Sequence, residues 1–210
     1  MKAVFWDLDG TLVDSEPVHF AIFKEMCEAY GIGATGVDYQ DFVGVPAREI
    51  FQKILPQFAP GTTVERLFAE KVARYEEKRS SLLARPNALD VWRRLEAGGV
   101  CQGVVSNADR LICQVNLAAV GLARPGLISV SRNDVLEAKP SPEPYLRGAF
   151  LAGVRPEECL AIEDSVVGAQ AALAASMKTI YWPQEDGETP PDGCLKTANI
   201  ATLNWDALLA

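Results

Sequence analysis

The stretch Ala3-Val4-Phe5-Trp6-Asp7-Leu8-Asp9-Gly10-Thr11 joins the first predicted strand to a pair of aspartates. Its first four residues form a short apolar run, which is typical of a strand buried on both faces of a parallel sheet. The two aspartates follow directly, and residues two apart on an extended strand point the same way. Both carboxylates can therefore face one point beyond the carboxyl edge of the sheet, where open α/β sheets bind ligands. A turn with an Asx cap gives the same pattern, so the pair alone does not decide the function.

Similar apolar runs recur along the chain and predict further strands at 100–105, 127–130, 159–162 and 179–182. The residues between these runs show helical periodicity, which predicts helices at 88–97, 110–120, 142–151 and 167–175. Strands that alternate with helices indicate an α/β fold, a Rossmann-like, mostly parallel sheet.

One interval interrupts this alternation, because no convincing strand lies between the first run and Val100. It predicts three helices instead: 17–30, which stops at Gly31-Ile32-Gly33; 47–58, after the turn Gly44-Val45-Pro46; and 64–83, ended near Pro86. We interpret the interval as an inserted all-helical domain of roughly seventy residues. The predicted organisation is an α/β core of residues 1–14 and 86–210 and a helical cap of residues 15–85. Residues 184–193 are predicted to form a surface loop.

The composition excludes several classes of protein. The 210 residues are 49% hydrophobic and 23% charged, as in an ordinary globular protein. The formal net charge of -8 argues against a general binder of nucleic acids or anionic membranes, which needs a basic surface. It leaves room for a small local pocket that binds an anion, while most of the acids are expected on a solvated surface.

The five cysteines and the single histidine point to no metal or disulfide framework. No two cysteines have C-x-x-C spacing, and one histidine makes a structural zinc site improbable. The first residues do not fit a signal peptide, and no apolar run is long enough to span a bilayer. These features predict a cytoplasmic protein.

A second acidic cluster ends another predicted strand, in Ile162-Glu163-Asp164-Ser165. Its acids should emerge at the same sheet edge as Asp7 and Asp9. We expect four converging carboxylates to raise one another's pKa and to need a hard divalent cation. Oxygen ligands of this kind suit Mg²⁺. The alternative is an exposed acidic helix N-terminus, which the helix dipole favours.

Two other segments supply what an anion would bind. Val105-Ser106-Asn107 offers a hydroxyl, an amide and backbone N–H groups at a predicted helix start, although a plain N-cap has the same residues. Glu137-Ala138-Lys139-Pro140-Ser141-Pro142 places one lysine between prolines, as a compact positive charge for a phosphate or for crowded acids. The alternative is a solvated loop lysine.

Together these segments resemble the four ordered motifs of the haloacid dehalogenase superfamily. They are Asp7 to Glu16, Ser106-Asn107, Lys139 to Tyr145, and Ile162 to Gly168, and they span nearly the whole chain. The predicted helical insert sits where that superfamily has its helical cap. The resemblance is closest to the branch of phosphatases and β-phosphoglucomutases.

The resemblance implies a role for each motif residue. Asp7 would be the nucleophile that forms an aspartyl-phosphate, and Asp9 would be the general acid and base. Gly10, Ser106, Asn107 and Lys139 would surround the phosphoryl group, with Lys139 also stabilising the charge on Asp7. Mg²⁺ would be bound by Asp7, the Asp9 backbone carbonyl and Asp164, with Glu163 as a direct or water-mediated ligand.

Three residues of the predicted cap are candidates for substrate binding. Their positions resemble those of a histidine, an arginine and a lysine in β-phosphoglucomutases, and they are His19, Arg48 and Lys71. Packing explains His19 equally well, and solvated side chains explain Arg48 and Lys71.

Departures from the mutase pattern favour a phosphatase. Where the mutases have a Ser-Ala-Ser-Lys-Asn-like segment, this chain has Ser106-Asn107-Ala108-Asp109-Arg110. Asn87 and Ser176 stand where the family usually has glycine, and Asn tolerates the left-handed backbone conformation.

The sequence therefore predicts a Mg²⁺-dependent phosphohydrolase of a small phosphorylated metabolite, with a sugar phosphate as the expected substrate. The alternatives are a β-phosphoglucomutase-like phosphomutase and a non-catalytic metabolite-binding protein on the same fold. We expect no nucleic-acid or membrane partner, and a monomer or weak homodimer.

Overall fold

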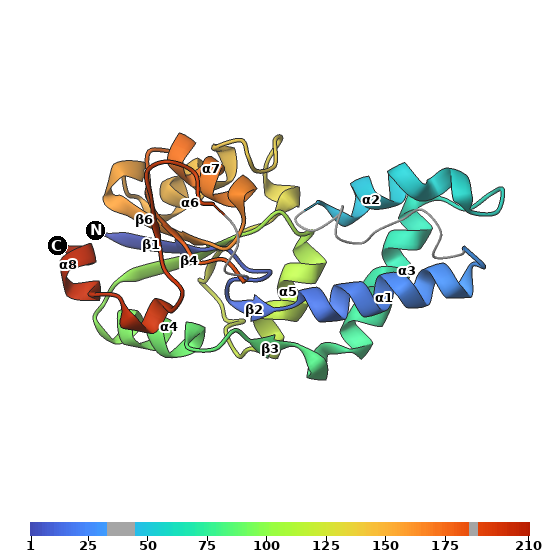
Figure 1. Cartoon of the computed structure of the whole chain (residues 1–210), viewed down its shortest axis with the longest axis horizontal. Coiled ribbons are helices and arrows are strands. Elements are labelled where there is room, and N and C mark those ends of the chain that lie inside the picture. The colour runs from blue at the N-terminus through green and yellow to red at the C-terminus, as the bar shows by residue number, and fades with distance from the viewer. Residues whose placement is uncertain (33–44, 185–188) are drawn as a thin grey trace.

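The computed structural model of the chain describes residues 1–32, 45–184 and 189–210 (Figure 1). The predicted turn residues Gly33 and Gly44, and residues 185–188 of the predicted loop, lie outside this part. Within it, no helix combines the length and the apolar character that a membrane span requires.

A six-stranded sheet forms the centre of the molecule. Its strands are β1 (Ala3–Trp6), β4 (Cys101–Val105), β5 (Ile128–Val130), β6 (Cys159–Glu163), β7 (Lys178–Tyr181) and β8 (Cys194–Lys196). They lie in the order β5-β4-β1-β6-β7-β8, and every neighbouring pair is parallel. This confirms the predicted α/β class. It also places β1 between β4 and β6, where the strand order reverses and such sheets bind ligands.

Helices cover both faces of this sheet (Figure 1). α6 (Glu143–Ala152) and α7 (Val166–Ala174) pack on one face. The other carries α4 (Ala88–Ala97), α5 (Arg110–Ala119) and the C-terminal α8 (Trp205–Leu209). Successive side chains of β1 point to opposite faces of the sheet. Val4 and Trp6 pack in the core under α4 and α5. Ala3 and Phe5 pack in the core under α6 and α7.

Three further helices lie at one end of the molecule, beyond the sheet (Figure 1). They are α1 (Glu16–Ala29), α2 (Ala47–Ile54) and α3 (Val64–Glu77), and α3 contacts both of the others as well as α5. The chain leaves the core through β2 (Val13–Asp14) and returns through β3 (Leu83–Ala84), which pair antiparallel. A cap of residues 15–85 stays a prediction. The antiparallel pair of β2 and β3 lies close to the predicted first and last residues of that cap.

Several predicted elements differ from those observed. The prediction of no strand before Val100 is wrong, because β2 and β3 are two-residue strands too short for a periodic pattern to indicate. The helix predicted at 64–83 ends earlier, at Glu77. The end of the predicted segment is a strand instead, because Leu83 and Ala84 pair with β2 and this pairing overrides helical propensity. α2 ends four residues early and continues as a 3₁₀ turn at Leu55–Gln57, because Pro56 has no backbone N–H to donate to the next α-helical hydrogen bond. The edge strand β8 was not predicted, because two of its three residues are exposed.

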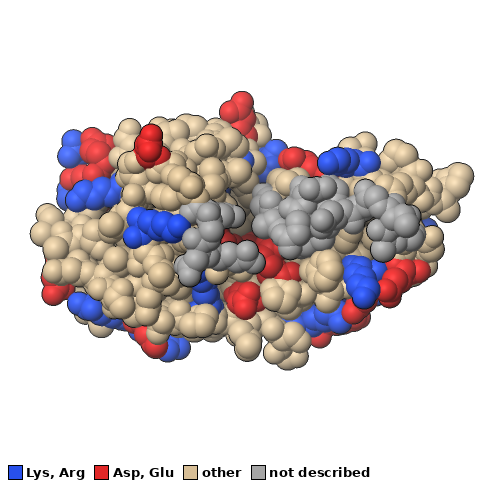
Figure 2. Space-filling model, viewed as in Figure 1, with Lys and Arg blue, Asp and Glu red and all other residues tan. Residues whose placement is uncertain are grey.

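Short 3₁₀ helices complete the described structure, at Leu55–Gln57, Arg79–Ser81, Arg132–Asp134, Pro156–Glu158 and Ile200–Thr202. Basic and acidic side chains are interspersed over the face shown in Figure 2, as expected of a solvated surface with no extended basic stretch among the described residues of that face.

Among the described residues, two that are not glycine adopt left-handed backbone conformations, Asn87 with φ 70° and Ser176 with φ 63°. These are the two positions at which the sequence departs from glycine, and the expectation that Asn87 tolerates this conformation is confirmed. A residue with a β-carbon is strained by about 1–2 kcal/mol in this conformation. Glycine avoids the strain, but it loses more backbone entropy on folding, which cancels part of the gain in stability.

Ser176→Gly should therefore raise the free energy of unfolding by about 1 kcal/mol and the melting temperature by roughly 2–4 °C. Denaturant and thermal melts measure both. Ser176→Ala is the matched control, because it removes the exposed hydroxyl and keeps the β-carbon. Equal melting temperatures for the Gly and Ala variants would show that backbone strain at residue 176 has no effect.

Candidate active site

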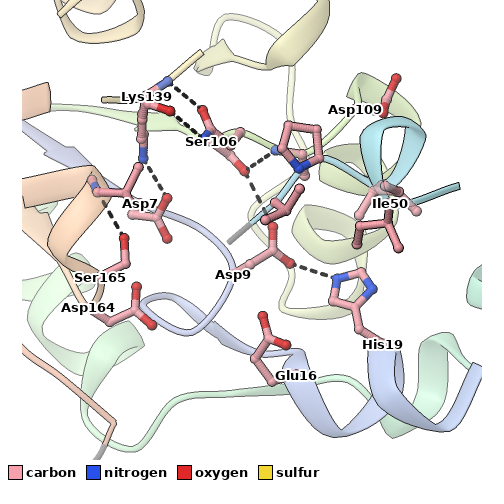
Figure 3. A pocket seen from close by; sticks show the side chains of 18 of the residues that line it. Asp7, Asp9, Glu16, His19, Ile50, Ser106, Asp109, Lys139, Asp164 and Ser165 are labelled. Atoms are coloured by element: carbon pink, nitrogen blue, oxygen red, sulfur yellow. Dashed lines mark hydrogen bonds and ion pairs between the residues drawn. The ribbon is translucent and has the colours of Figure 1, made fainter. Parts of the chain in front are cut away.

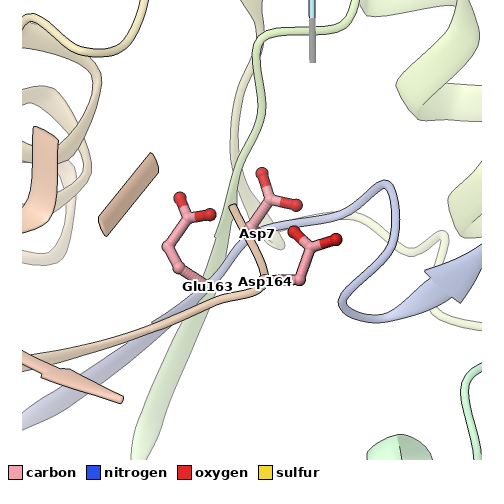
Figure 4. Close-up of side chains that lie close together, drawn as sticks. All are labelled: Asp7, Glu163 and Asp164. Atoms are coloured by element: carbon pink, nitrogen blue, oxygen red, sulfur yellow. The ribbon is translucent and has the colours of Figure 1, made fainter. Parts of the chain in front are cut away.

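The register of the sheet brings three acidic side chains together. Trp6 lies level with Ile162 of the neighbouring strand, so the next residue, Asp7, lies beside Glu163. Asp164 follows at the turn into α7, and carboxylate oxygens of Asp7, Glu163 and Asp164 all lie within 4.8 Å of one another (Figure 4). We call these three residues the acid triad. Both predicted acidic clusters thus contribute to one site at the carboxyl edge of the sheet.

Lys139 lies inside the triad rather than in solvent. Its side chain is only 3% exposed, and its ammonium donates hydrogen bonds to Asp7 Oδ1 at 2.6 Å, Glu163 Oε1 at 2.6 Å and the Val105 carbonyl at 2.7 Å. Burial lowers the pKa of Lys139, but the carboxylates of Asp7 and Glu163 outweigh burial and raise it above the ordinary value. All three ammonium hydrogens have acceptors, which excludes the solvated loop lysine.

One ammonium does not balance three carboxylates. Burial raises the pKa of Asp7 well above its ordinary value, with Glu163 and Asp164 adding to the rise and Lys139 opposing it. Burial and the Glu163 carboxylate raise the pKa of Asp164 from 3.8 to about 7. The predicted increase in pKa is therefore found at both residues, and the site favours an added positive charge.

Glu163 is buried completely beneath the other two acids. Its Oε1 accepts hydrogen bonds from Lys139 and from the Tyr145 hydroxyl, while its buried Oε2 has no partner among the described residues. A β-carbon at Gly168 would lie 2.0 Å from Oε2, so only glycine fits there. An exposed acidic helix N-terminus, the alternative explanation of this segment, is excluded for Glu163 by its burial.

Gly10 brings the loop after β1 close to Asp164. Its φ is 80°, and a β-carbon there would lie 2.0 Å from Asp164 Oδ2. Thr11 in the same turn donates a hydrogen bond from Oγ1 to Asp164 Oδ1 at 3.2 Å. The observations that fit a divalent cation are the three neighbouring carboxylates, the raised pKa values of two of them and the unpartnered Glu163 oxygen.

The carboxylate of Asp9 does not join the triad, which corrects the expectation of four converging carboxylates. Its Oδ1 accepts hydrogen bonds from Ser15 Oγ at 2.7 Å and Asn116 Nδ2 at 2.8 Å, and lies 3.2 Å from His19 Nε2 (Figure 3). Burial alone would raise the pKa of Asp9, but His19, Ser15 and Asn116 outweigh it and lower the pKa to about 2. The expectation of a raised pKa is therefore wrong for this residue.

Ser106 and Asn107 lie between Asp9 and Lys139. The Ser106 hydroxyl lies 3.4 Å from Asp9 Oδ2 and accepts a hydrogen bond from the Ala108 backbone N–H at 2.9 Å. The Asn107 amide bonds the backbone of Lys139 twice, donating to its carbonyl at 3.2 Å and accepting from its N–H at 2.9 Å. α5 begins at Arg110, where a helix was predicted, and its N-cap is Asp109, so Ser106 is not the helix cap.

A pocket opens over these residues and extends to the three helices beyond the sheet (Figure 3). Of the predicted site residues, the structure brings together at this pocket Asp7, Asp9, His19, Lys71, Ser106, Asn107, Lys139 and Asp164. Gly10 and Glu163 lie directly behind Asp164 and Asp7. Burial lowers the pKa of Lys71, against the raising effect of Asp9, Glu16 and Asp109.

Of the three predicted substrate-binding residues of the cap, Arg48 is the one that does not line the pocket. Its guanidinium lies 4.0 Å from the centre of the Phe68 ring and its Nε donates a hydrogen bond to Asp109 Oδ1 at 3.3 Å. Asp109 is 5% exposed, so this ion pair links α2 to the start of α5. Arg48 is thus neither in the pocket nor simply solvated.

Four residues that contact the site were not among the predicted site residues. Tyr145 bonds Glu163, Asn116 bonds Asp9, Tyr75 bonds Asn116, and Arg85 donates to the Gly10 carbonyl at 2.9 Å. Asn116 could have been predicted from the sequence, because it is a polar residue on the apolar face of an amphipathic helix. The other three are ordinary side chains until the fold brings them to the site.

Comparisons with known proteins agree on one family. Residues 1–176 match the family model of haloacid dehalogenase-like hydrolases. YhcW of Bacillus subtilis, described as a phosphatase, is 30% identical, with 88% of this chain and 84% of that protein covered. The phosphorylated carbohydrates phosphatase of Thermotoga maritima is 28% identical over 86% of this chain and 84% of that one.

Two further matches bear on length and fold. The chloroplastic protein Suppressor of Quenching 1 of Arabidopsis thaliana is 31% identical over 86% of this chain, which spans only 18% of that protein. The crystal structure of CbbY from Rhodobacter sphaeroides in complex with phosphate superposes with a TM-score of 0.83 at 23% identity, covering 93% and 92% of the two chains. The latter match shows a shared fold.

The raised pKa values predict how the stability of the metal-free protein depends on pH. The folded state holds protons on Asp7 and Asp164 that the unfolded chain releases near pH 4, so the free energy of unfolding should fall as pH rises toward 7. We expect a loss of roughly 1–3 kcal/mol between pH 5 and pH 8 in chelator-treated protein. Urea denaturation at each pH measures it, and Asp164→Asn should flatten the dependence. A stability that rises across this range would contradict the assignment of these charges.

Proposed function

The chain belongs to the haloacid dehalogenase-like hydrolases, and on this premise we propose that it is a phosphohydrolase of small phosphorylated metabolites, with sugar phosphates as the substrate class. The prediction of an enzyme is confirmed by the family and by the phosphatase names of its relatives. The observation that carries the proposal is the Asp7 carboxylate, held by a buried lysine between two acids at the floor of a pocket. The phosphorylated carbohydrates named for one relative support the substrate class.

Asp7 is the proposed nucleophile. One of its carboxylate oxygens, Oδ1, is held by Lys139, which leaves the other to attack phosphorus. The new bond joins Asp7 to the phosphoryl group while the bond to the ester oxygen breaks, and water later hydrolyses the aspartyl-phosphate. Lys139, Ser106 and the Asn107 backbone stabilise the charge on the transferring group, and positioning supplies most of the rate in such reactions.

Asp9 is the proposed general acid and base. In the arrangement observed it is ionised, which suits it to accept a proton from the attacking water in the second step. For the first step it must carry a proton on Oδ2, the oxygen that faces Ser106, and give it to the leaving oxygen. The separation of this carboxylate from the acid triad lets the two take different protonation states.

The acid triad fits Mg²⁺, and we propose Mg²⁺ as the cofactor. Asp7, Asp164 and the Asp9 backbone carbonyl would hold it, with Glu163 bound directly or through a water. When bound, the ion neutralises the triad and draws charge from the phosphoryl oxygens. Glu163 has one oxygen committed to Lys139 and Tyr145, which leaves its second oxygen for this purpose.

Asp7→Asn tests the nucleophile. The variant keeps the shape of the side chain and removes the attacking oxygen anion, so turnover of phosphomonoesters should fall by at least about 10³-fold. Phosphate release from a panel of sugar and polyol phosphates with Mg²⁺ measures it. Asp90→Asn, at an aspartate that is 80% exposed on α4, is the matched control and should leave turnover unchanged. Full activity in pure Asp7→Asn protein would remove Asp7 from the mechanism.

A β-phosphoglucomutase-like phosphomutase is the alternative, and one structural feature disfavours it. A mutase must bind the second phosphate of a bisphosphate, and Arg48, one of the predicted substrate-binding residues, is already paired with the buried Asp109. Asp109 stands within the segment where the mutases have a lysine and an asparagine. A negative charge there opposes a second phosphate.

Incubation with β-glucose 1-phosphate and a trace of its bisphosphate separates the two activities. We expect inorganic phosphate as the product, because Arg48 is paired with Asp109 and the buried Asp109 carboxylate opposes a second phosphate. Formation of glucose 6-phosphate would establish the mutase instead. Tight binding of a phosphomonoester with no turnover across the panel would support a non-catalytic protein. A cytoplasmic location and a monomer or weak homodimer remain predictions.

A further inference from the structure

The two oxygens of the Asp9 carboxylate have different surroundings. Oδ1 accepts hydrogen bonds from Ser15 Oγ and Asn116 Nδ2 and lies 3.2 Å from His19 Nε2, so three polar groups surround it. Oδ2 faces the Ser106 hydroxyl at 3.4 Å, on the side of the phosphoryl site. The carboxylate is therefore anchored by one oxygen and presents the other.

Asn116 is the one anchor that comes from the α/β core rather than from the start of α1. It lies on α5 with no exposed surface, among buried apolar neighbours that include Ile112, Cys113 and Leu117. Its Nδ2 donates to Asp9 Oδ1 at 2.8 Å, and its Oδ1 accepts from the Tyr75 hydroxyl at 2.7 Å. The acceptor side of the amide is thus occupied by a donor, and this orients the NH₂ group toward Asp9.

Tyr75 extends this connection to the helices beyond the sheet. It lies on α3, is completely buried and stacks on the imidazole of His19, with ring centroids 4.6 Å apart and an angle of 19° between the rings. One side chain therefore supports two of the groups around Asp9, Asn116 by a hydrogen bond and His19 by ring contact. The orientation of Asp9 depends on where α3 lies against α5.

Apolar packing alone does not account for this pair. A buried hydroxyl and amide are tolerated in an apolar core only when each has a partner, and apolar side chains of similar shape would fill the same space without that requirement. Here the chain of polar groups ends on the carboxylate proposed as the general acid and base.

We propose that Tyr75 and Asn116 are positioning residues that anchor Oδ1 of Asp9 and thereby present Oδ2 to the leaving oxygen of the substrate. The inference rests on the proposed phosphohydrolase function. In the first step, Oδ2 gives its proton to the ester oxygen as the bond from that oxygen to phosphorus breaks and the bond from phosphorus to Asp7 forms. In the second step, Oδ2 takes a proton back from the attacking water.

Substrates with different leaving groups test whether the orientation of Asp9 Oδ2 affects the reaction rate. An alkoxide leaves a phosphate ester poorly unless it receives a proton, whereas p-nitrophenolate leaves without one. A misplaced general acid should therefore lower kcat/KM for alkyl phosphates and spare p-nitrophenyl phosphate. General acid catalysis contributes about 10²–10⁴-fold, so losing its alignment should cost about 10–100-fold on alkyl esters.

The variants are Asn116→Leu, which removes the anchor, and Tyr75→Phe, which removes only the hydroxyl and keeps the ring on His19. Tyr30→Phe is the matched control, because that hydroxyl donates to Glu70 at 2.8 Å between α1 and α3, and Tyr30 does not line the pocket. The substrates are p-nitrophenyl phosphate and the sugar or polyol monophosphate that the unaltered enzyme hydrolyses fastest. The quantity compared is the ratio of kcat/KM for the alkyl ester to kcat/KM for the aryl ester.

We expect this ratio to fall about 10–100-fold in Asn116→Leu, about threefold to tenfold in Tyr75→Phe and not at all in Tyr30→Phe. A loss that is equal for both substrates in the first two variants would show a purely structural role and overturn the inference. Should Asn116→Leu fail to fold, Tyr75→Phe decides, and an unchanged ratio overturns the proposal. An unaltered enzyme that hydrolyses neither substrate contradicts the proposed function itself, which separates the two failures.

Discussion

The buried ammonium of Lys139 is the interaction on which the rest of the site depends. It joins Asp7 at the end of β1, Glu163 at the end of β6 and the Val105 carbonyl at the end of β4, so the ends of three adjacent strands meet at one cation. Without it, carboxylates would remain buried and uncompensated, which destabilises proteins by about 3–5 kcal/mol when one partner of such a pair is removed. The Asn107 amide holds the lysine loop at its backbone and so fixes where this cation lies.

A single lysine leaves the triad short of positive charge, and that deficit explains the chemistry available here. Asp7 and Asp164 have raised pKa values in the absence of a further cation. Asp9, two residues after Asp7, is surrounded by hydrogen-bond donors and has a pKa of about 2. Carboxylates in such different surroundings can take different parts in one reaction. The same deficit makes a divalent cation a favourable partner for the triad.

Most of the fold could be predicted from the sequence, because β1 and its neighbour β6 lie in apolar runs that are buried on both faces. Convergence of Asp7 with Glu163 followed from the same pattern, since parallel strands end at one edge. The two-residue strands β2 and β3 could not be predicted, because their pairing is a tertiary contact with no local period. The direction of the Asp9 carboxylate and the partner of Arg48 were also out of reach, because both depend on how the helices of residues 16–77 pack against α5.

We propose that Asp7 becomes phosphorylated during turnover. Acid quenching of the enzyme with Mg²⁺ and a hydrolysed phosphomonoester, followed by mass spectrometry of the peptide that contains Asp7, tests it most directly. We expect the mass of one phosphoryl group on that residue within the first turnover, and no such mass in Asp7→Asn. Release of inorganic phosphate in a single turnover with no phosphorylated Asp7 at any quench time would contradict it.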